Sequence, residues 1–172
     1  QIGDTGTVKG QDIELSVRDV KKENHSFIHI CKGDFNIHKV VEPVECTVDN
    51  LRRESIRRNH TATHLMHKAL KQVLGDHVHQ AGSLVHPEYL RFDLTHYENI
   101  SKEQLLEIEN IVNQQILLNR TLEVSVKKYN EAKKAGAEVL FGEKYSDDVR
   151  VIQIGEFSME LCGGTHVDRT GD

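Results

Sequence analysis

The spacing of apolar residues changes once along the chain, near Asp49. Before that point, short β-branched runs at 13–17, 27–30 and 37–41 alternate with polar turns, a pattern typical of a small barrel or sandwich. From residue 50 to residue 74, apolar residues recur every three or four positions, which predicts one long helix ended by Gly75. We therefore expect a small β-barrel segment (1–48) followed by a second unit (49–172).

The second unit mixes strand-like and helix-like patterns. Ser101 and Gln104 form a capping box before a second helical stripe that reaches Ile116. A short helix is predicted at 130–135, and strands are predicted at 79–85, 89–94, 122–126, 149–154 and 157–161. This order predicts an α+β fold in which helices pack on a mainly antiparallel sheet.

Length and composition restrict the class of protein. With 172 residues, of which 37% are hydrophobic, the chain can form one domain, or one domain with a small appended unit. It has no secretory signal and no apolar run long enough to cross a bilayer, so no membrane partner is expected. Three cysteines without a pairing pattern favour a reducing, cytoplasmic location. The chain begins with Gln1, which predicts a mature product or an excised piece.

Charge and aromatic content bear on the partners. A net charge of −5 argues against capture of nucleic acid by the whole surface, although it allows a local basic patch. Tryptophan is absent and aromatic residues make up 5%, which gives little support to a base-stacking platform. No glycine-rich phosphate loop is present, so we expect no use of ATP by this chain.

Two pairs of metal-ligating residue types stand far apart in the sequence. His60 and His64 are one helical turn apart, so both imidazoles lie on one helix face. Cys162 and His166 are separated by a segment with two glycines, which lets the backbone fold tightly enough for thiolate and imidazole to converge. Each pair has an ordinary structural explanation, a partly buried helix face or a buried cysteine near a loop histidine. Together they form a tetrahedral set suited to one Zn²⁺ ion.

The residues around His60 exclude one class of metal site and suggest a binding surface. Thr61 follows His60, so the H-E-x-x-H metalloprotease pattern and its general base are missing. His67 shares the helix face and could be a competing ligand or a donor to a ligand, but a solvent-exposed histidine is the simpler interpretation. The basic residues before His60 could hold RNA phosphates, although a solvated helix face is the more common meaning of each; they are Arg52, Arg53, Arg57 and Arg58.

Several segments resemble the editing domain of alanyl-tRNA synthetases. The most specific are 57–67 (RRNHTATHLMH) and 161–166 (LCGGTH). Supporting matches occur at 80–85 (QAGSLV), 90–93 (LRFD) and 137–145 (AEVLFGEKY), and the opening 1–6 (QIGDTG) is similar to the small β-barrel that precedes this domain. The C-G-G-T-H form favours this family over the related threonyl-tRNA synthetase module. Free-standing editing proteins are also similar, but the match along the whole chain favours a fragment of a full synthetase.

The resemblance implies a function and a set of site residues. It implies zinc held by His60, His64, Cys162 and His166, and hydrolysis of tRNA(Ala) mischarged with serine or glycine. It also implies that Gln80 lies near the substrate. On chemical grounds, Gln80 or Thr63 could form a hydrogen bond with the serine hydroxyl that alanine lacks. The acceptor end of tRNA(Ala) is the expected partner, with Arg57, Arg58, Gly163 and Gly164 as candidate contacts. The remaining synthetase domains would lie elsewhere in a full-length chain.

This activity has a chemical reason. A pocket shaped for alanine cannot strongly exclude the smaller glycine, and it rejects serine by only about 100-fold, so a second, hydrolytic site is needed. A metal can polarise the ester carbonyl or activate water. Four protein ligands would however close a tetrahedral site, whereas catalytic zinc usually keeps one position open. Either the ion expands its coordination, one ligand is loose, or the metal orients groups while water attacks from elsewhere.

Three other functions remain open from the sequence. A non-catalytic, zinc-stabilised RNA-binding module would unfold on chelation and would not deacylate tRNA. A metal-dependent hydrolase of small esters or amides would turn over without RNA. An interaction domain with scattered histidines would bind no stoichiometric metal.

Overall fold

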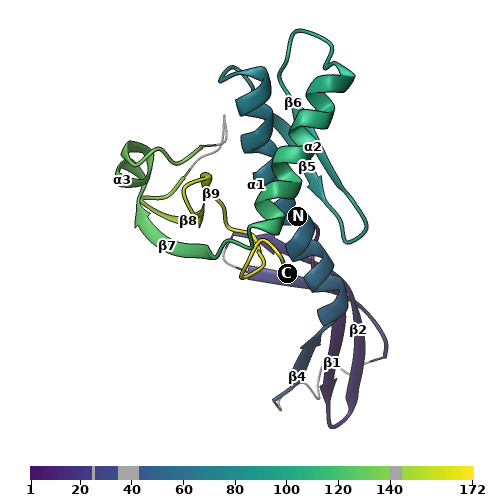
Figure 1. The fold of residues 1–172 in the computed structure, drawn as a ribbon. Helices are drawn as coiled ribbons and strands as arrows, with labels where there is room; N and C mark the ends of the chain where they lie inside the picture. Colours follow the sequence, from purple (N-terminus) through teal and green to yellow (C-terminus); the bar gives the residue numbers. More distant parts are fainter. Residues whose placement is uncertain (25, 35–42, 140–144) are drawn as a thin grey trace.

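The computed structural model describes residues 1–24, 26–34, 43–139 and 145–172. Two helices stand side by side, with the N-terminal sheet at one end and the C-terminal strands on one flank (Figure 1). The predicted run at 37–41 lies outside the described residues, and so do residues 140–144 of the family-like segment 137–145.

The N-terminal segment forms one four-stranded antiparallel sheet in the order β3-β2-β1-β4. Its strands are β1 (Gly6–Gly10), β2 (Ile13–Glu23), β3 (Ser26–Lys32) and β4 (Glu45–Val48). Among the described residues, β3 and β4 are the two edges of this sheet, and every residue of β3 is exposed. Closure into a barrel, and a domain boundary after residue 48, therefore stay predictions.

The long helix α1 (Asn50–Leu74) has the bounds that the sequence predicts. The Asp49 side chain accepts a hydrogen bond from the backbone N–H of Arg52 at 3.1 Å, which satisfies one free donor of the first turn. At the other end, Gly75 adopts a φ of 111°, a conformation that disfavours a side chain, while its N–H still bonds to Lys71. Local sequence thus sets both ends of the helix.

A hairpin and a second helix pack along α1. The strands β5 (Gln80–Val85) and β6 (Leu90–Leu94) pair with each other, and α2 (Lys102–Leu117) follows with the predicted capping box of Ser101 and Gln104. Their shared core contains Ala69, Leu70, Val78 and Ile108. This packing covers one side of α1.

The C-terminal strands form a separate three-stranded antiparallel sheet, in the order β7-β8-β9. It consists of β7 (Leu122–Lys128), β8 (Asp148–Ile154) and β9 (Ser158–Leu161), with the short α3 (Tyr129–Lys134) after β7. Leu65 of α1 packs into a core with Leu122, Ile152, Ile154 and Val167. This contact places the segment after β9 against the middle of α1.

The predicted α+β fold is confirmed, and all pairings between named strands are antiparallel. The described strands nevertheless form three sheets rather than one. The long α1 contacts strands of two of them, because it separates the hairpin from the C-terminal strands. In the part of the chain that the structure describes, no helix is both long and apolar enough to span a bilayer.

The burial of Leu65 between α1 and the C-terminal sheet should contribute strongly to the stability of the fold. Leu65 is 1% exposed, so Leu65→Ala should lower the free energy of unfolding by about 2–5 kcal/mol through lost burial and a cavity. Leu51→Ala makes the same change on the same helix at a side chain that is 85% exposed, and it should change stability by less than about 0.5 kcal/mol. Urea denaturation measures both, and equal effects would contradict this packing.

Candidate metal centre

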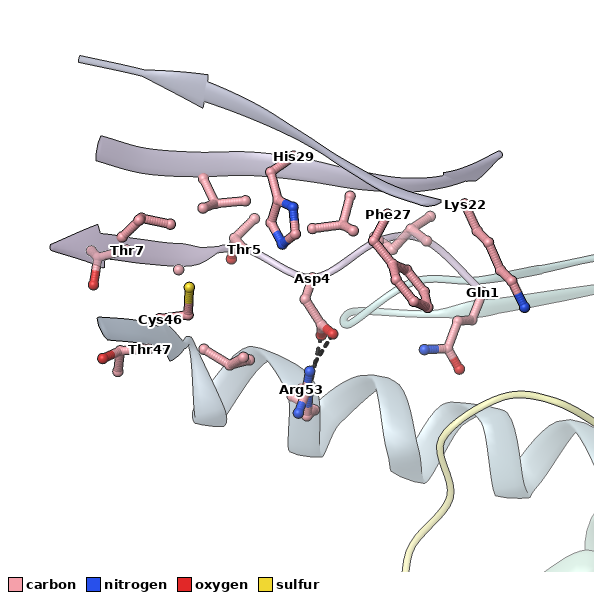
Figure 2. Close-up of a pocket in the computed structure, with 17 residues that line it drawn as sticks. Gln1, Asp4, Thr5, Thr7, Lys22, Phe27, His29, Cys46, Thr47 and Arg53 are labelled. Carbon is pink, nitrogen blue, oxygen red and sulfur yellow. Dashed lines mark hydrogen bonds and ion pairs between the residues drawn. The ribbon is translucent and has the colours of Figure 1, made fainter. Parts of the chain in front are cut away.

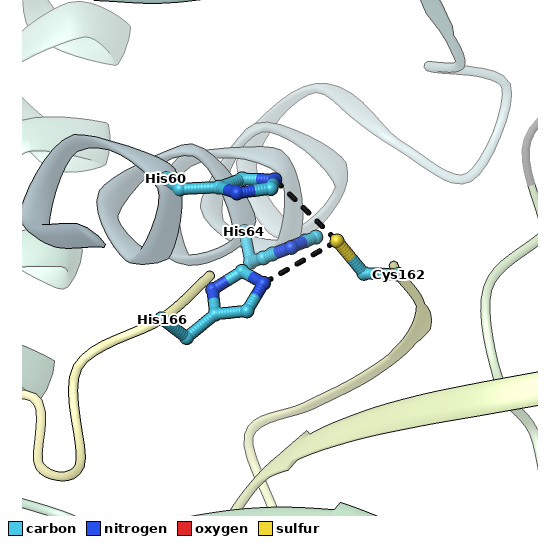
Figure 3. A group of neighbouring side chains, drawn as sticks. All are labelled: His60, His64, Cys162 and His166. Atoms are coloured by element: carbon cyan, nitrogen blue, oxygen red, sulfur yellow. Dashed lines mark hydrogen bonds between the residues drawn. The ribbon is translucent and has the colours of Figure 1, made fainter. Parts of the chain in front are cut away.

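Two distant segments bring four ligand atoms together. His60 and His64 come from α1, and Cys162 and His166 come from the segment after β9 (Figure 3). One ligand atom from each lies within 4.8 Å of the others. The Cys162 Sγ is 3.4 Å from the His60 Nε2 and 3.3 Å from the His166 Nε2. A tetrahedral zinc ion would separate sulfur and nitrogen ligands by about 3.5 Å. The predicted juxtaposition is therefore present.

The Cys162–His166 segment is shaped by hydrogen bonds to its backbone. Arg150 on β8 donates to the carbonyl oxygens of Cys162, at 2.9 Å, and of Gly164, at 2.6 Å. A Cβ on Gly164 would collide with the His60 ring, whereas one on Gly163 would meet nothing within 4 Å. Gly164 is thus needed for close approach to α1, and the exposed Gly163 leaves open space beside the cluster.

The three imidazole rings of the cluster each contact another side chain through Nδ1. His60 Nδ1 lies 2.9 Å from Gln1 Oε1, His64 Nδ1 lies 2.6 Å from Glu160 Oε2, and His166 Nδ1 lies 3.3 Å from Thr61 Oγ1. A partner at Nδ1 holds the ring and leaves Nε2 available for a metal. All three rings are therefore held in an orientation suited to ligation.

Glu160 links two histidines in the interior. Its carboxylate, on β9, faces His64 and also lies 3.3 Å from the Nδ1 of His67. His67 is 5% exposed, so the expectation that it lies in solvent is wrong. The cause is the C-terminal sheet, which covers this face of α1 and contributes the carboxylate. His67 is instead a partner of the group that orients His64.

The protonation of the cluster suits a cation. Burial alone would raise the pKa of the Cys162 thiol, but hydrogen bonds with His166 and His60 outweigh it and lower that pKa to about 3. Burial, together with His60 and His64, lowers the pKa of His166 to about 4. Burial also acts to lower the pKa of His64, yet Glu160 and Cys162 raise it to about 10. These shifts favour the thiolate form of Cys162 and the neutral form of His166, which are the forms that bind a metal, whereas a metal would have to displace a proton from His64.

Among the described residues, two buried side-chain nitrogens have no hydrogen-bond partner, His64 Nε2 and His67 Nε2, and the first of them tests the fit. His64 Nε2 is buried and has no hydrogen-bond partner, although an unpaired buried polar atom is costly. It belongs to the four-residue cluster. A metal ion at the centre would satisfy it, and the mixed sulfur and nitrogen set is suited to zinc.

The two predicted substrate-side residues make other contacts. The Gln80 side chain, at the start of β5, donates to Ser83 Oγ at 3.3 Å. Thr63 is buried, and its hydroxyl donates to the Asn59 carbonyl at 2.8 Å. The threonine that contacts a residue of the cluster is Thr61, whose hydroxyl oxygen lies 3.3 Å from the His166 Nδ1. The roles of Gln80 and Thr63 stay predictions.

The basic run before His60 is largely occupied by the protein itself. Arg52 donates to the Gly3 carbonyl at 2.8 Å, and Arg53 pairs with Asp4. Arg57 bonds to Glu54, to Asp168 and to the backbone carbonyl of His166. Arg58 is exposed and contacts Ser55. Contact of Arg57 and Arg58 with RNA stays a prediction, and the exposed Arg58 is the freer of the two.

Sequence reasoning missed the residues that orient the ligands, which are Gln1, Thr61, Arg150 and Glu160. Glu160 carries a signal in the sequence, because it is an acidic residue between the apolar Met159 and Leu161, directly before Cys162. Arg150 carries a similar signal, because it stands between Val149 and Val151, whereas Gln1 and Thr61 carry none.

The glycine pair gives a matched test of the cluster geometry. Gly164→Ala should weaken binding of Zn²⁺ by about tenfold or more, because the new methyl group displaces the loop from His60. Gly163→Ala should leave the affinity unchanged, since space is open there. Competition with a chromophoric chelator measures both affinities. Equal affinities in the two variants would show that the loop does not approach His60 as described.

Known proteins resemble both the cluster segment and the whole chain. The family model described as the threonyl and alanyl tRNA synthetase second additional domain matches residues 149–172, which include Cys162 and His166. An alanine--tRNA ligase of Carboxydothermus hydrogenoformans is 55% identical over 172 residues, which cover 99% of this chain. One of Alkaliphilus oremlandii is 51% identical over 176 residues, and one of Pseudoalteromonas translucida is 48% identical over 174, each covering 100% of this chain.

The match covers only part of those relatives, because this chain spans 20% of the length of each. It nevertheless extends across the N-terminal sheet and both ligand pairs. Residues 149–172 therefore match the threonyl and alanyl tRNA synthetase second additional domain, and the chain as a whole corresponds to the editing-domain segment of alanine--tRNA ligases.

Proposed function

We propose that this chain hydrolyses tRNA(Ala) mischarged with serine or glycine, at a zinc site formed by His60, His64, Cys162 and His166. In a full-length ligase, the other domains would activate alanine and bind the rest of the tRNA. The similarity to alanine--tRNA ligases supports a tRNA-editing segment. The same site in a free-standing deacylase would perform the same reaction.

The observation that carries the proposal is the arrangement of the four donors. Each histidine of the cluster holds a partner at Nδ1, and in the described part of the chain the buried His64 Nε2 has no hydrogen-bond partner. Zinc bound there would supply a Lewis acid for the ester carbonyl or for water. Glu160 and Thr61 would hold the rings in place, and the C-terminal sheet would keep solvent from the inner side of the site.

The open side of the cluster is suited to the acylated end of the tRNA. Gly163 is exposed, with free space beside it, so the backbone offers no obstacle there. The exposed Arg58, two residues before His60, could neutralise a phosphate of the acceptor end. Arg57 would act mainly by holding the His166 carbonyl.

Gln80 offers a basis for choosing serine. Among the described residues, the hydrogen bond of its side chain uses Nε2, and its Oε1 remains able to accept from a serine hydroxyl. A hydrogen bond to that hydroxyl would be lost with alanine. The Thr63 hydroxyl already donates to Asn59, so it could only accept from the substrate.

A closed set of four protein ligands favours one second candidate, a zinc-stabilised RNA-binding module without catalysis. Both candidates require the metal. They differ in whether the ester bond is cut.

Deacylation of seryl-, glycyl- and alanyl-tRNA(Ala), with metal content measured in parallel, separates these functions. We expect hydrolysis of the seryl and glycyl forms, little hydrolysis of the alanyl form, and loss of activity with a chelator. His64→Ala should reduce the rate by at least about a hundredfold, because it removes a ligand. His79→Ala, at an exposed histidine, is the control and should have no effect.

Other outcomes would assign other functions. Bound metal with no hydrolysis would support the binding module. If small aminoacyl esters without RNA were hydrolysed as fast as aminoacyl-tRNA, a general hydrolase would be supported. A chain without stoichiometric metal would support neither the zinc-dependent deacylase nor the zinc-stabilised RNA-binding module.

Gln80→Ala tests the basis of discrimination. If the amide oxygen accepts a hydrogen bond from the serine hydroxyl, the ratio of the seryl-tRNA to the alanyl-tRNA hydrolysis rate should fall by about tenfold. The fall should come mainly from slower hydrolysis of seryl-tRNA. Gln72→Ala, at an exposed position on α1, serves as the control. An unchanged ratio in Gln80→Ala would remove this residue from the specificity mechanism.

A further inference from the structure

Gln1 connects the N-terminal segment to the metal centre. Its Oε1 accepts from the backbone N–H of Thr165 at 2.9 Å and lies 2.9 Å from the His60 Nδ1. Its Nε2 donates to the Thr165 hydroxyl at 3.1 Å. Gln1 lies 164 residues from Thr165 and 59 from His60, so no local spacing links these groups.

These contacts determine which nitrogen of His60 carries the proton. The backbone N–H of Thr165 can only donate, so the amide atom beside it has to be the oxygen. The same oxygen faces His60 Nδ1, which therefore has to be the protonated nitrogen. In the neutral ring the lone pair then lies on Nε2, 3.4 Å from the Cys162 sulfur, where both atoms could bind one metal ion.

The position of Gln1 is itself secured by its neighbours. The Ile2 N–H donates to the Val85 carbonyl at 3.2 Å, and Arg52 of α1 donates to the Gly3 carbonyl at 2.8 Å. The Asp4 carboxylate pairs with Arg53. Figure 2 shows the resulting course, with Asp4 facing Arg53 and the Gln1 side chain directed toward α1.

We infer that Gln1 is a positioning residue of the metal centre, which sets the tautomer of His60 and joins that ring to the Cys162–His166 segment. The centre is then completed by the N-terminal segment and is not contained in residues 49–172. This inference rests on the proposed metal site. It adds a residue outside the ligand set, and outside the predicted editing unit, to the parts that this site requires.

Gln1→Leu removes the acceptor while keeping a side chain of similar size. We expect the affinity for Zn²⁺ to fall by about 10–100-fold, the usual effect of losing a partner of a ligating histidine. Gln1→Glu retains an acceptor for both N–H groups, so its affinity should stay close to that of the unchanged chain. Gln11→Leu makes the same substitution at an exposed glutamine and should leave affinity unchanged.

A measurement without metal separates positioning from general loss of structure. Long-range ¹⁵N–¹H correlation spectra of the metal-free chain, recorded where the His60 ring is neutral, report its tautomer. We expect the Nδ1–H form in the unchanged chain and in Gln1→Glu, and a mixture of tautomers in Gln1→Leu. An unchanged tautomer and an unchanged zinc affinity in Gln1→Leu would overturn the inference. If both respond to Gln1→Leu but no variant deacylates tRNA, the proposed function fails and the positioning role stands.

Discussion

The Glu160 side chain extends from β9 toward α1, where His64, His67 and the Ser158 hydroxyl surround its carboxylate. A charge buried this deeply would cost several kcal/mol unless partners compensate it. Burial opposes ionisation of Glu160, but the two histidines hold its pKa well below the usual range. Helix and sheet must therefore meet in one register, and in that register Cys162 faces His60. The apolar contact of Leu65 brings the two layers together, and the carboxylate selects the alignment.

The loop after β9 depends on this alignment but is shaped by its own groups. Arg150 holds two of its carbonyl oxygens, and the missing side chain of Gly164 lets it lie against His60. Gln1 then contacts both His60 and Thr165. The centre is thus assembled from three parts of the chain, each held by contacts outside the cluster.

Much of the architecture follows from local sequence. Asp49 and Gly75 set the ends of α1, and Ser101 with Gln104 sets the start of α2, because capping involves residues within one turn of the helix end. The two pairs of candidate ligands were also predictable, since the i to i+4 spacing and the glycine pair each bring two side chains together, and tertiary packing then joins the pairs. The division of the strands into three sheets was not predictable, because an alternating apolar pattern identifies a strand but does not show which strand pairs with it.

The side chains around the cluster also separate into features that the sequence predicts and features that only the tertiary structure decides. A helical wheel places His60, His64 and His67 on one face of α1, but it does not show whether solvent or a sheet covers that face. Thr61 and Thr63 look alike in the sequence, yet Thr61 contacts His166 and Thr63 bonds to its own helix. Spacing along the chain thus accounts for the ligands, whose geometry is set within one turn of backbone. The partners of the three histidines come from segments 59 to 105 residues away, and long-range packing alone brings them together.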